Sequence, residues 1–325
     1  MNKKYIALTL GDPTGIGPEL ILKLLEKPIF LKKKLVIIAN EFILRKTLKL
    51  LKKEFPLHKL SQDLNWKKNY LNFFDVQLKL KNQSFQFGKP NKFTSQYAFA
   101  FITEAIEMAK KGLVKAVVTN PVSKSEITRA GIPFVGHTEL FGERTNSEKT
   151  YMTFIGPKGM ASLVTTHLAL KDVSSAIKKR SIIDNFKMTW PVAQKLYGSK
   201  IRAAILSFNP HAGEAGLFGD EEIKEINPAV RYLKKRFSVD GPFPSDSFWG
   251  FLYKRRPYHL ILSMYHDQGL IPVKMGILGK TVNTTLGLPF VRTSVDHGTA
   301  YDIAGKNKAD VSGLQQAIHY AEKLI

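Results

Sequence analysis

Three histidines follow short apolar runs of the chain, and their chemistry suits the binding of a metal ion. His167 stands in Thr-Thr-His, His211 in Asn-Pro-His-Ala-Gly-Glu and His266 in Tyr-His-Asp-Gln-Gly. Because parallel strands end along one edge of a sheet, three imidazoles that each follow a strand could converge on one divalent ion. The alternative is that each histidine caps a strand or hydrogen-bonds within its own loop. The long spacing along the chain leaves both interpretations open.

A polar segment in the last fifth of the chain is a second candidate site. Asn283 to Pro289 runs into Arg292 to Thr299, and both stretches are rich in hydrogen-bonding groups and glycine. Such a composition is costly in a core and predicts a ligand-binding loop. Lys274, Asn283 and Arg292 would offer a point charge, an amide and a bidentate guanidinium to a phosphate or carboxylate. The alternative is a solvated loop with incidental cations.

Further candidates lie near these segments. Asp246 and Asp267 could orient a histidine or accept a proton, or could simply cap a turn. His137 stands in the loop-like sequence Gly-His-Thr-Glu. The opening loop from Gly11 to Glu19, GDPTGIGPE, matches neither G-x-G-x-x-G nor the phosphate loop with its lysine. We therefore interpret it as a tight turn between a strand and a helix.

The elements that would position these residues alternate between strand and helix. Apolar runs predict buried strands at Tyr5 to Leu10, Leu35 to Ala39, Lys115 to Thr119, Ser162 to Thr166, Arg202 to Ser207 and Leu260 to Met264. Helical spacing of apolar residues begins at Thr94, a suitable N-cap, and ends at Gly112. This alternation predicts an α/β protein with a largely parallel sheet, whose ligand sites lie where strands end and loops begin.

Composition excludes several classes of protein. The chain has 325 residues, of which 44 % are hydrophobic, as in a soluble globular protein. Cysteine is absent, so there is no thiolate metal site, disulfide or cysteine nucleophile. No apolar stretch approaches the roughly 20 residues that cross a bilayer, and the first apolar run is too short for a signal peptide. We therefore expect a cytoplasmic protein with no membrane partner.

The charge is strongly positive and makes nucleic acid the first partner to consider. Lys plus Arg number 49 against 27 Asp plus Glu, a formal net charge of +22. A nucleic-acid site would need clustered basic residues with stacking aromatics, and an affinity that falls steeply with salt. Net charge alone indicates only nonspecific attraction, so nucleic-acid binding stays a distant alternative.

In chain order, these segments resemble the 4-hydroxythreonine-4-phosphate dehydrogenase family of pyridoxal phosphate biosynthesis. The matching segments are GDPTGIGPE at 11, TNPVSK at 119, GHTELF at 136, TTHLALKD at 165, NPHAGE at 209, GPFPSD at 241, YHDQGLIPVK at 265 and VNTTLGLPFVRTSVDHGTAYDIAGK at 282. The resemblance implies two α/β/α subdomains similar to isocitrate and isopropylmalate dehydrogenases, with the active site in the interdomain cleft at a dimer interface. We expect residues 1–130 plus 285–325 to form the first subdomain and 131–284 the second.

The resemblance also implies a reaction. The family oxidises 4-phosphohydroxy-L-threonine to 2-amino-3-oxo-4-phosphooxybutanoate, which loses carbon dioxide to give 3-amino-2-oxopropyl phosphate. The expected cofactors are NAD, or NADP, and a divalent metal such as zinc, magnesium or cobalt. The expected assembly is a homodimer with metal ligands from both subunits. The cofactor would bind without a Rossmann fingerprint, which accounts for the missing glycine pattern.

Residue by residue, the resemblance assigns metal ligation to His167, His211 and His266. It assigns substrate binding to His137, Thr138, Lys274, Asn283 and Arg292. Asp246 and Asp267 would maintain the site, and Asp267, beside a ligand histidine, is a candidate for the proton-accepting base.

Some positions depart from the family pattern. Thr14 stands where alanine is common, Asn120 lies within the Thr-x-Pro-x-x-Lys segment, and Ser207-Phe208 replaces a frequent Gly-Leu pair. None of these removes a proposed ligand. They leave open a paralogous dehydrogenase of 4-phospho-D-threonate or 4-phospho-D-erythronate, substrates that lack the amine.

Overall fold

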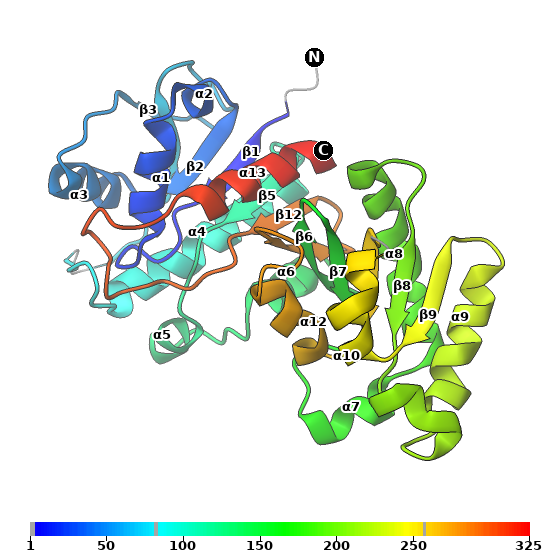
Figure 1. Cartoon of the computed structure of the whole chain (residues 1–325). Coiled ribbons are helices and arrows are strands. Elements are labelled where there is room, and N and C mark those ends of the chain that lie inside the picture. Colours follow the sequence, from blue (N-terminus) through cyan, green and yellow to red (C-terminus); the bar gives the residue numbers. More distant parts are fainter. Residues whose placement is uncertain (1–3, 81–83, 256–257) are drawn as a thin grey trace. The chain divides into compact units, whose positions relative to one another are not determined.

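Two compact units make up the chain. Unit 1 comprises residues 1–149 with 288–323 and 325, and unit 2 comprises residues 150–287 with 324. The computed structural model describes residues 4–80, 84–255 and 258–325. The sequence placed subdomain boundaries after residues 130 and 284, whereas the structure divides the chain after 149 and 287. In Figure 1, unit 1 runs from blue to cyan and returns in orange to red, and the green to orange part is unit 2.

In its described part, unit 1 is built on six parallel strands. Their order across the sheet is β3 (Leu57–Lys59), β4 (Leu71–Asp75), β2 (Leu35–Ala39), β1 (Ile6–Thr9), β5 (Ala116–Thr119) and β12 (Val291–Ser294). Its helices are α1 (Gly17–Leu25), α2 (Pro28–Leu31), α3 (Glu41–Leu51), α4 (Lys92–Lys110), α5 (Lys124–Arg129), α6 (His137–Arg144) and α13 (Ser312–Leu324). Every residue of β1, β2 and β5 is buried, as expected of parallel strands covered by helices.

Unit 2 has a mixed sheet. Its strand order is β11 (Val282–Leu286), β6 (Tyr151–Gly156), β7 (Gly159–Leu163), β10 (Leu260–Ser263), β8 (Ala203–Leu206) and β9 (Val239–Phe243). The pairs β11–β6 and β6–β7 are antiparallel, and the other described pairs of this unit are parallel. Helices α8 (Lys179–Tyr197) and α12 (His266–Lys274) both pack on β7 and β10.

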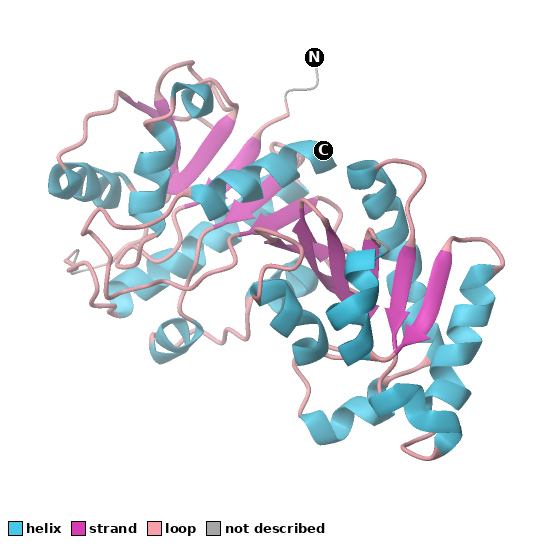
Figure 2. Ribbon diagram, in the orientation of Figure 1, coloured by secondary structure: helices cyan, strands magenta, loops and turns pink. Residues whose placement is uncertain are grey.

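The remaining helical segments of unit 2 are shorter. They are α7 (Leu170–Ala176), the turn Pro210–Gly216, the π-helix Glu222–Ile226, α9 (Asn227–Lys234), α10 (Ser245–Ser247), the π-helix Phe248–Leu252 and α11 (Tyr253–Arg255). Phe248 is fully buried and, with Trp249, belongs to the core on which Val273 of α12 packs. Figure 2 shows helices around the strands of each unit, which confirms the predicted α/β class.

The start of α4 differs from the prediction. The N-cap is Asn91 rather than Thr94, and the Asn91 side chain accepts a hydrogen bond from the Thr94 backbone at 3.0 Å. The Thr94 hydroxyl accepts one from the Asn91 backbone at 3.0 Å in return. This reciprocal capping box makes Thr94 the third residue of the helix, a position in which a polar side chain satisfies the N-cap backbone.

Two other predictions need correction. The expected ligand-binding loop from Asn283 onward is largely strand, because it contains β11 and β12. Threonine and valine are frequent in both runs and favour strands, which their polar neighbours concealed. The strand expected at Ser162 to Thr166 instead spans Gly159–Leu163. Among the helices of the described residues, none is long and apolar enough to cross a membrane.

Candidate active site

The three candidate metal ligands follow neighbouring strands of unit 2. β7, β10 and β8 are parallel neighbours, and His167, His266 and His211 come shortly after their respective carboxyl ends. The carboxyl ends of parallel strands lie at the same edge of a sheet. The fold therefore brings all three histidine-bearing segments to one edge.

His167 and His266 lie beside each other at this edge. Their ring centroids are 5.7 Å apart and the ring planes are tilted by 44°. His266 is the first residue of α12, and its Nδ1 lies 2.7 Å from Oδ1 of Asp267. A carboxylate on Nδ1 holds the proton there and leaves Nε2 as the nitrogen that can bind a metal. Asp267 thus has the position of an orienting group for His266.

His211 lies on an unusual turn. Residues 211–215 all have positive φ angles, between 41° and 79°. Across the described ranges of the chain, no group of three or more histidine, aspartate or glutamate side chains is arranged to hold a metal ion. Of the three expected ligands, His167 and His266 are the two whose rings are seen to lie side by side.

Asp246 and Asp267 line one cavity of unit 2. Its volume is about 380 Å³, and Trp249, Tyr265 and Ile271 also line it. The Trp249 Nε1 is buried and has no hydrogen-bond partner within the part of the chain that the structure describes. A buried N–H donor of this kind is costly unless a ligand or water accepts its proton. The two carboxylates that the sequence singled out therefore share a hollow that also has an unused donor in its wall.

Arg292 is a buried cation of unit 1. Only 2 % of its surface is exposed, and one of its Nη atoms donates a hydrogen bond to Thr119 Oγ1 at 2.8 Å. Its guanidinium carbon lies 5.6 Å from the ring centroid of Phe141. Burial lowers the pKa of Arg292 to about 10, and the Glu139 carboxylate opposes that shift. Arg292 therefore stays charged at neutral pH, and a buried guanidinium is suited to bind an anion.

His137 is the first residue of α6 and lies in the field of two cations. Burial, and then the positive charges of Arg292 and Lys124, hold its pKa well below the usual 6.5, so the ring is neutral at pH 7. Its Nε2 is buried and makes no hydrogen bond to any residue that the structure describes. The imidazole thus has a ring nitrogen available for a ligand. Thr138 follows it as the second residue of α6.

Sequence reasoning missed Lys124 as a residue of this group. A Cβ on Gly136 would lie 3.0 Å from Lys124 Nζ and 2.6 Å from Glu139 Oε2, so these two charged side chains fill the space above the glycine. Lys124 is also the first residue of α5, where the helix dipole disfavours a cation. That unfavourable position, at the end of the TNPVSK segment, is a signal that could have identified it.

The other two substrate-binding candidates belong to unit 2. Lys274 ends α12, and Asn283 lies on β11 opposite Phe154 of β6. The Asn283 Oδ1 is buried, and none of the described residues donates a hydrogen bond to it. His137, Thr138 and Arg292 belong to unit 1, so the five candidates are divided between the two units.

Hydrogen bonds within unit 1 fix the conformation of the opening loop, Gly11 to Glu19. Asp12 Oδ1 accepts a hydrogen bond from Thr14 Oγ1 at 2.7 Å, and Asp12 Oδ2 accepts one from the Tyr301 hydroxyl at 2.7 Å. A Cβ on Gly17 would lie 2.2 Å from the carbonyl oxygen of Leu10. Glycine is therefore needed there for close backbone packing, as expected of a tight turn.

The family comparison agrees with the segments quoted above. The family model of pyridoxal phosphate biosynthetic protein PdxA matches residues 31–321, which is most of both units. The chain belongs to this family. It is therefore an oxidoreductase, and the resemblance that the motifs indicated is confirmed.

Individual relatives match over nearly their full length. A 4-hydroxythreonine-4-phosphate dehydrogenase of Desulforapulum autotrophicum is 36 % identical, over 98 % of this chain and 95 % of that protein. A protein of Symbiobacterium thermophilum, assigned provisionally as D-threonate 4-phosphate dehydrogenase, is also 36 % identical, over 99 % of this chain and 97 % of its own. The solved 4-hydroxythreonine-4-phosphate dehydrogenase of Klebsiella pneumoniae is 33 % identical with a TM-score of 0.82, over 98 % of both chains.

The histidine pair fits the divalent metal that the family resemblance implies. Imidazole nitrogen is a ligand for zinc, cobalt and similar ions, and a carboxylate on the remote nitrogen is the usual support for such a ligand. His167, His266 and Asp267 provide this donor set in one unit. Within the described part of one chain, no third protein ligand is arranged with them to hold a metal ion.

Proposed function

We propose that this protein oxidises 4-phosphohydroxy-L-threonine with NAD, or NADP, in the pathway that makes pyridoxal phosphate. The substrate C3 would pass a hydride to the nicotinamide, and its hydroxyl proton would pass to a base. The C1–C2 bond of the resulting 2-amino-3-oxo-4-phosphooxybutanoate would then break. Carbon dioxide leaves, and C2 takes up a proton to give 3-amino-2-oxopropyl phosphate. The family match over residues 31–321 is the observation that carries this proposal.

We assign the metal to His167 and His266 of one subunit and to His211 of the second subunit in a homodimer. Among the described residues no three histidine, aspartate or glutamate side chains are arranged to hold a metal ion, which supports an assembly in which a second copy supplies a ligand. When bound, a divalent ion would supply Lewis acidity that lowers the pKa of the substrate hydroxyl. Neutral imidazole ligands would leave the ion its full charge and open positions for substrate.

Substrate binding is assigned to His137, Thr138, Lys274, Asn283 and Arg292. Arg292 and Lys274 suit the phosphate, since binding energy from a remote anionic group can position the reacting carbon. Neutral His137 can share a hydrogen bond with a substrate oxygen, and Thr138 can donate one. Asn283 has a buried amide oxygen that can accept one.

The two acidic residues have different proposed roles. Asp267 contacts His266, so we assign it to orientation of that ligand and keep it as the candidate base. Asp246 lines the same cavity and would maintain the polarity of the site. The opening loop does not match G-x-G-x-x-G, so the proposed cofactor site is one without a Rossmann fingerprint.

The test is NADH absorbance with purified protein, NAD and 4-phosphohydroxy-L-threonine, with and without a chelator. We expect NADH formation that the chelator abolishes and added divalent metal restores. His167, His211 and His266 replaced singly by alanine should each lose metal and activity. NADH formation that is indifferent to the chelator, or three variants that keep metal and activity, would contradict the metal assignment.

A second candidate substrate is a phosphorylated aldonate, 4-phospho-D-threonate or 4-phospho-D-erythronate. The Symbiobacterium relative, 36 % identical over 99 % of this chain, favours it. These compounds keep the phosphate and the hydroxyl but lack the amine. Catalytic efficiencies measured side by side on the amino acid and the aldonates would decide between them.

A further inference from the structure

The turn that carries His211 has a left-handed backbone conformation that needs stabilising contacts from other parts of the chain. His211, Ala212, Glu214 and Ala215 have φ angles of 51°, 54°, 41° and 54°, and only Gly213 among residues 211–215 is a glycine. A run of left-handed residues with side chains is unfavourable, because Cβ approaches the following carbonyl oxygen. Such a conformation persists only where surrounding contacts fix it.

Glu222 supplies those contacts. Its side chain is 1 % exposed, and Oε1 accepts hydrogen bonds from the backbone nitrogens of Phe208 at 2.7 Å and Asn209 at 2.8 Å. Its Oε2 accepts a third bond from Asn209 Nδ2 at 2.9 Å. A Cβ on Gly213 would lie 2.8 Å from the same Oε2. The carboxylate therefore fills the inner side of the turn and anchors the two residues that lead into it.

Glu221 links this turn to the segment that follows His167. One oxygen of Glu221 accepts a hydrogen bond from Asn209 Nδ2 at 2.6 Å, and the other accepts one from the Ser174 hydroxyl. Ser174 belongs to α7, which begins three residues after His167. Partial burial raises the pKa of Glu221, but the hydrogen bonds from Ser174 and Asn209 lower it by more. The net pKa lies below the ordinary value of a glutamate, so Glu221 is ionised at neutral pH.

We propose that Glu222 is a positioning residue that fixes His211 for metal binding, and that Glu221 ties its turn to the His167 segment. This rests on the proposed metal centre. A carboxylate is suited to the task because both oxygens accept hydrogen bonds, and here all the donors are N–H groups of the chain. An amide of the same size would turn an N–H group toward Asn209 Nδ2, so one acceptor would become a second donor.

The experiment compares Glu222→Gln with Glu225→Gln in the full-length protein. Glu225 belongs to the same π-helix, but its carboxylate accepts a hydrogen bond from the Lys179 backbone at 2.7 Å and does not bind the His211 turn. Amide hydrogen exchange without metal reports the order of residues 208–216. Titration with Co²⁺ reports affinity, and the visible spectrum of bound Co²⁺ reports ligand geometry.

We expect faster exchange at residues 208–216, a Co²⁺ affinity reduced about tenfold and an altered Co²⁺ spectrum for Glu222→Gln only. Exchange and affinity equal to those of Glu225→Gln would overturn the proposal. If the wild-type protein binds no Co²⁺, the proposed metal centre fails, and unchanged exchange in Glu222→Gln would overturn the positioning role as well. Circular dichroism and the melting temperature identify a variant that has simply unfolded.

Discussion

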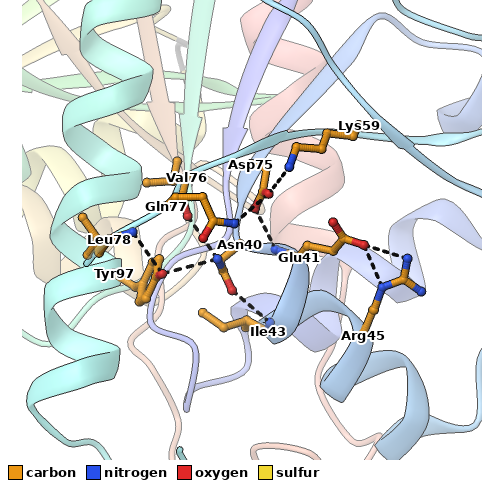
Figure 3. Close-up of polar contacts among 10 residues, drawn as sticks. All are labelled: Asn40, Glu41, Ile43, Arg45, Lys59, Asp75, Val76, Gln77, Leu78 and Tyr97. Atoms are coloured by element: carbon orange, nitrogen blue, oxygen red, sulfur yellow. Dashed lines mark hydrogen bonds and ion pairs between the residues drawn. The ribbon is translucent and has the colours of Figure 1, made fainter. Parts of the chain in front are cut away.

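Two polar clusters of unit 1 differ in how completely their atoms are hydrogen-bonded. In the first, Asp75 ends β4 with its side chain 1 % exposed (Figure 3). Oδ1 of Asp75 accepts a hydrogen bond from the Glu41 backbone at 3.0 Å. Its Oδ2 accepts bonds from Gln77 Nε2 at 2.7 Å and from Lys59 Nζ at 2.5 Å. Every acceptor of this carboxylate thus has a donor from the protein.

Asn40 completes the same cluster. It follows β2 and caps α3, because its Oδ1 accepts a hydrogen bond from the Ile43 backbone at 3.3 Å. Its Nδ2 donates to the Val76 carbonyl at 3.1 Å and to the Tyr97 hydroxyl at 3.3 Å. A buried amide with both ends paired joins a strand end, a helix start and α4. The cluster therefore fastens elements together and needs no ligand.

The second cluster, around His137, is built in the opposite way. It contains a buried guanidinium at Arg292, a second cation at Lys124, and a ring nitrogen for which the described residues provide no hydrogen bond. Unused polar atoms lower stability, so their presence favours a role in binding. The comparison indicates that the first cluster is structural and that the second is suited to bind a ligand. It predicts opposite phenotypes for the two clusters.

The largest effect is expected for Arg292→Gln. Loss of the buried charge that we propose binds the substrate phosphate should lower kcat/KM by about 10²–10³-fold. Steady-state kinetics with the phosphorylated substrate would measure this. The control is Arg202→Gln in unit 2, where the guanidinium pairs with Asp240 at 2.6 Å and both side chains are 37 % exposed. We expect less than a threefold change there. Full activity in Arg292→Gln would show that Arg292 has a structural role and does not bind the substrate.

Asp75→Asn should show the reverse phenotype. The amide would turn a donor toward Lys59 and Gln77, so we expect the free energy of unfolding to fall by about 2 kcal/mol. The kcat/KM of the folded protein should stay within about twofold, since no ligand is involved. Urea unfolding and steady-state kinetics measure the two quantities.

Glu41→Gln is the matched control for Asp75→Asn. Its carboxylate pairs with Arg45 on the surface, with side chains 33 % and 65 % exposed, so its loss should cost less than about 0.5 kcal/mol. If Asp75→Asn reduced kcat/KM as strongly as Arg292→Gln while leaving stability intact, the distinction between the two clusters would be lost.

The α/β class was predictable because β1, β2, β5, β7, β8 and β10 are largely apolar runs. Leu35 to Ala39 was predicted with its observed bounds, since its residues are all apolar and all buried. β11 and β12 were missed because Asn283 and Arg292 interrupt their apolar pattern, and these are the residues that would face a ligand. β3, β4, β6 and β9 were not predicted either, so the apolar runs located only part of the two sheets.

The candidate site was predictable where topology determines it. Strand order alone brings the segments of His167, His211 and His266 to one edge. The left-handed turn at His211 was not predictable, because one glycine in five residues gives no sign of five positive φ angles. Its cause lies in Glu222, eleven residues further along the chain. Contacts of this kind depend on tertiary structure and leave no local pattern.

At neutral pH the smallest effect expected from the comparison is at His137, whose contribution to stability depends on pH. Its pKa in the folded protein is lowered from 6.5 by burial, Arg292 and Lys124. Below pH 6.5 the unfolded chain therefore binds a proton that the folded protein refuses, and stability falls as the pH decreases. The slope contributed by this residue is at most about 1.4 kcal/mol per pH unit. His137→Gln should lose that contribution.

Urea unfolding of wild type and His137→Gln at pH values from 5 to 8 measures the difference in slope. Lys124→Met is the graded control, because removal of one of the two cations should raise the pKa of His137 and reduce the slope without abolishing it. Phosphate bound beside His137 would act in the same direction as Lys124→Met, since an anion stabilises the imidazolium. Equal slopes in wild type and His137→Gln would show that this ring titrates as an exposed histidine does. The contrast between the His137 cluster and the Asp75 cluster would then be weakened.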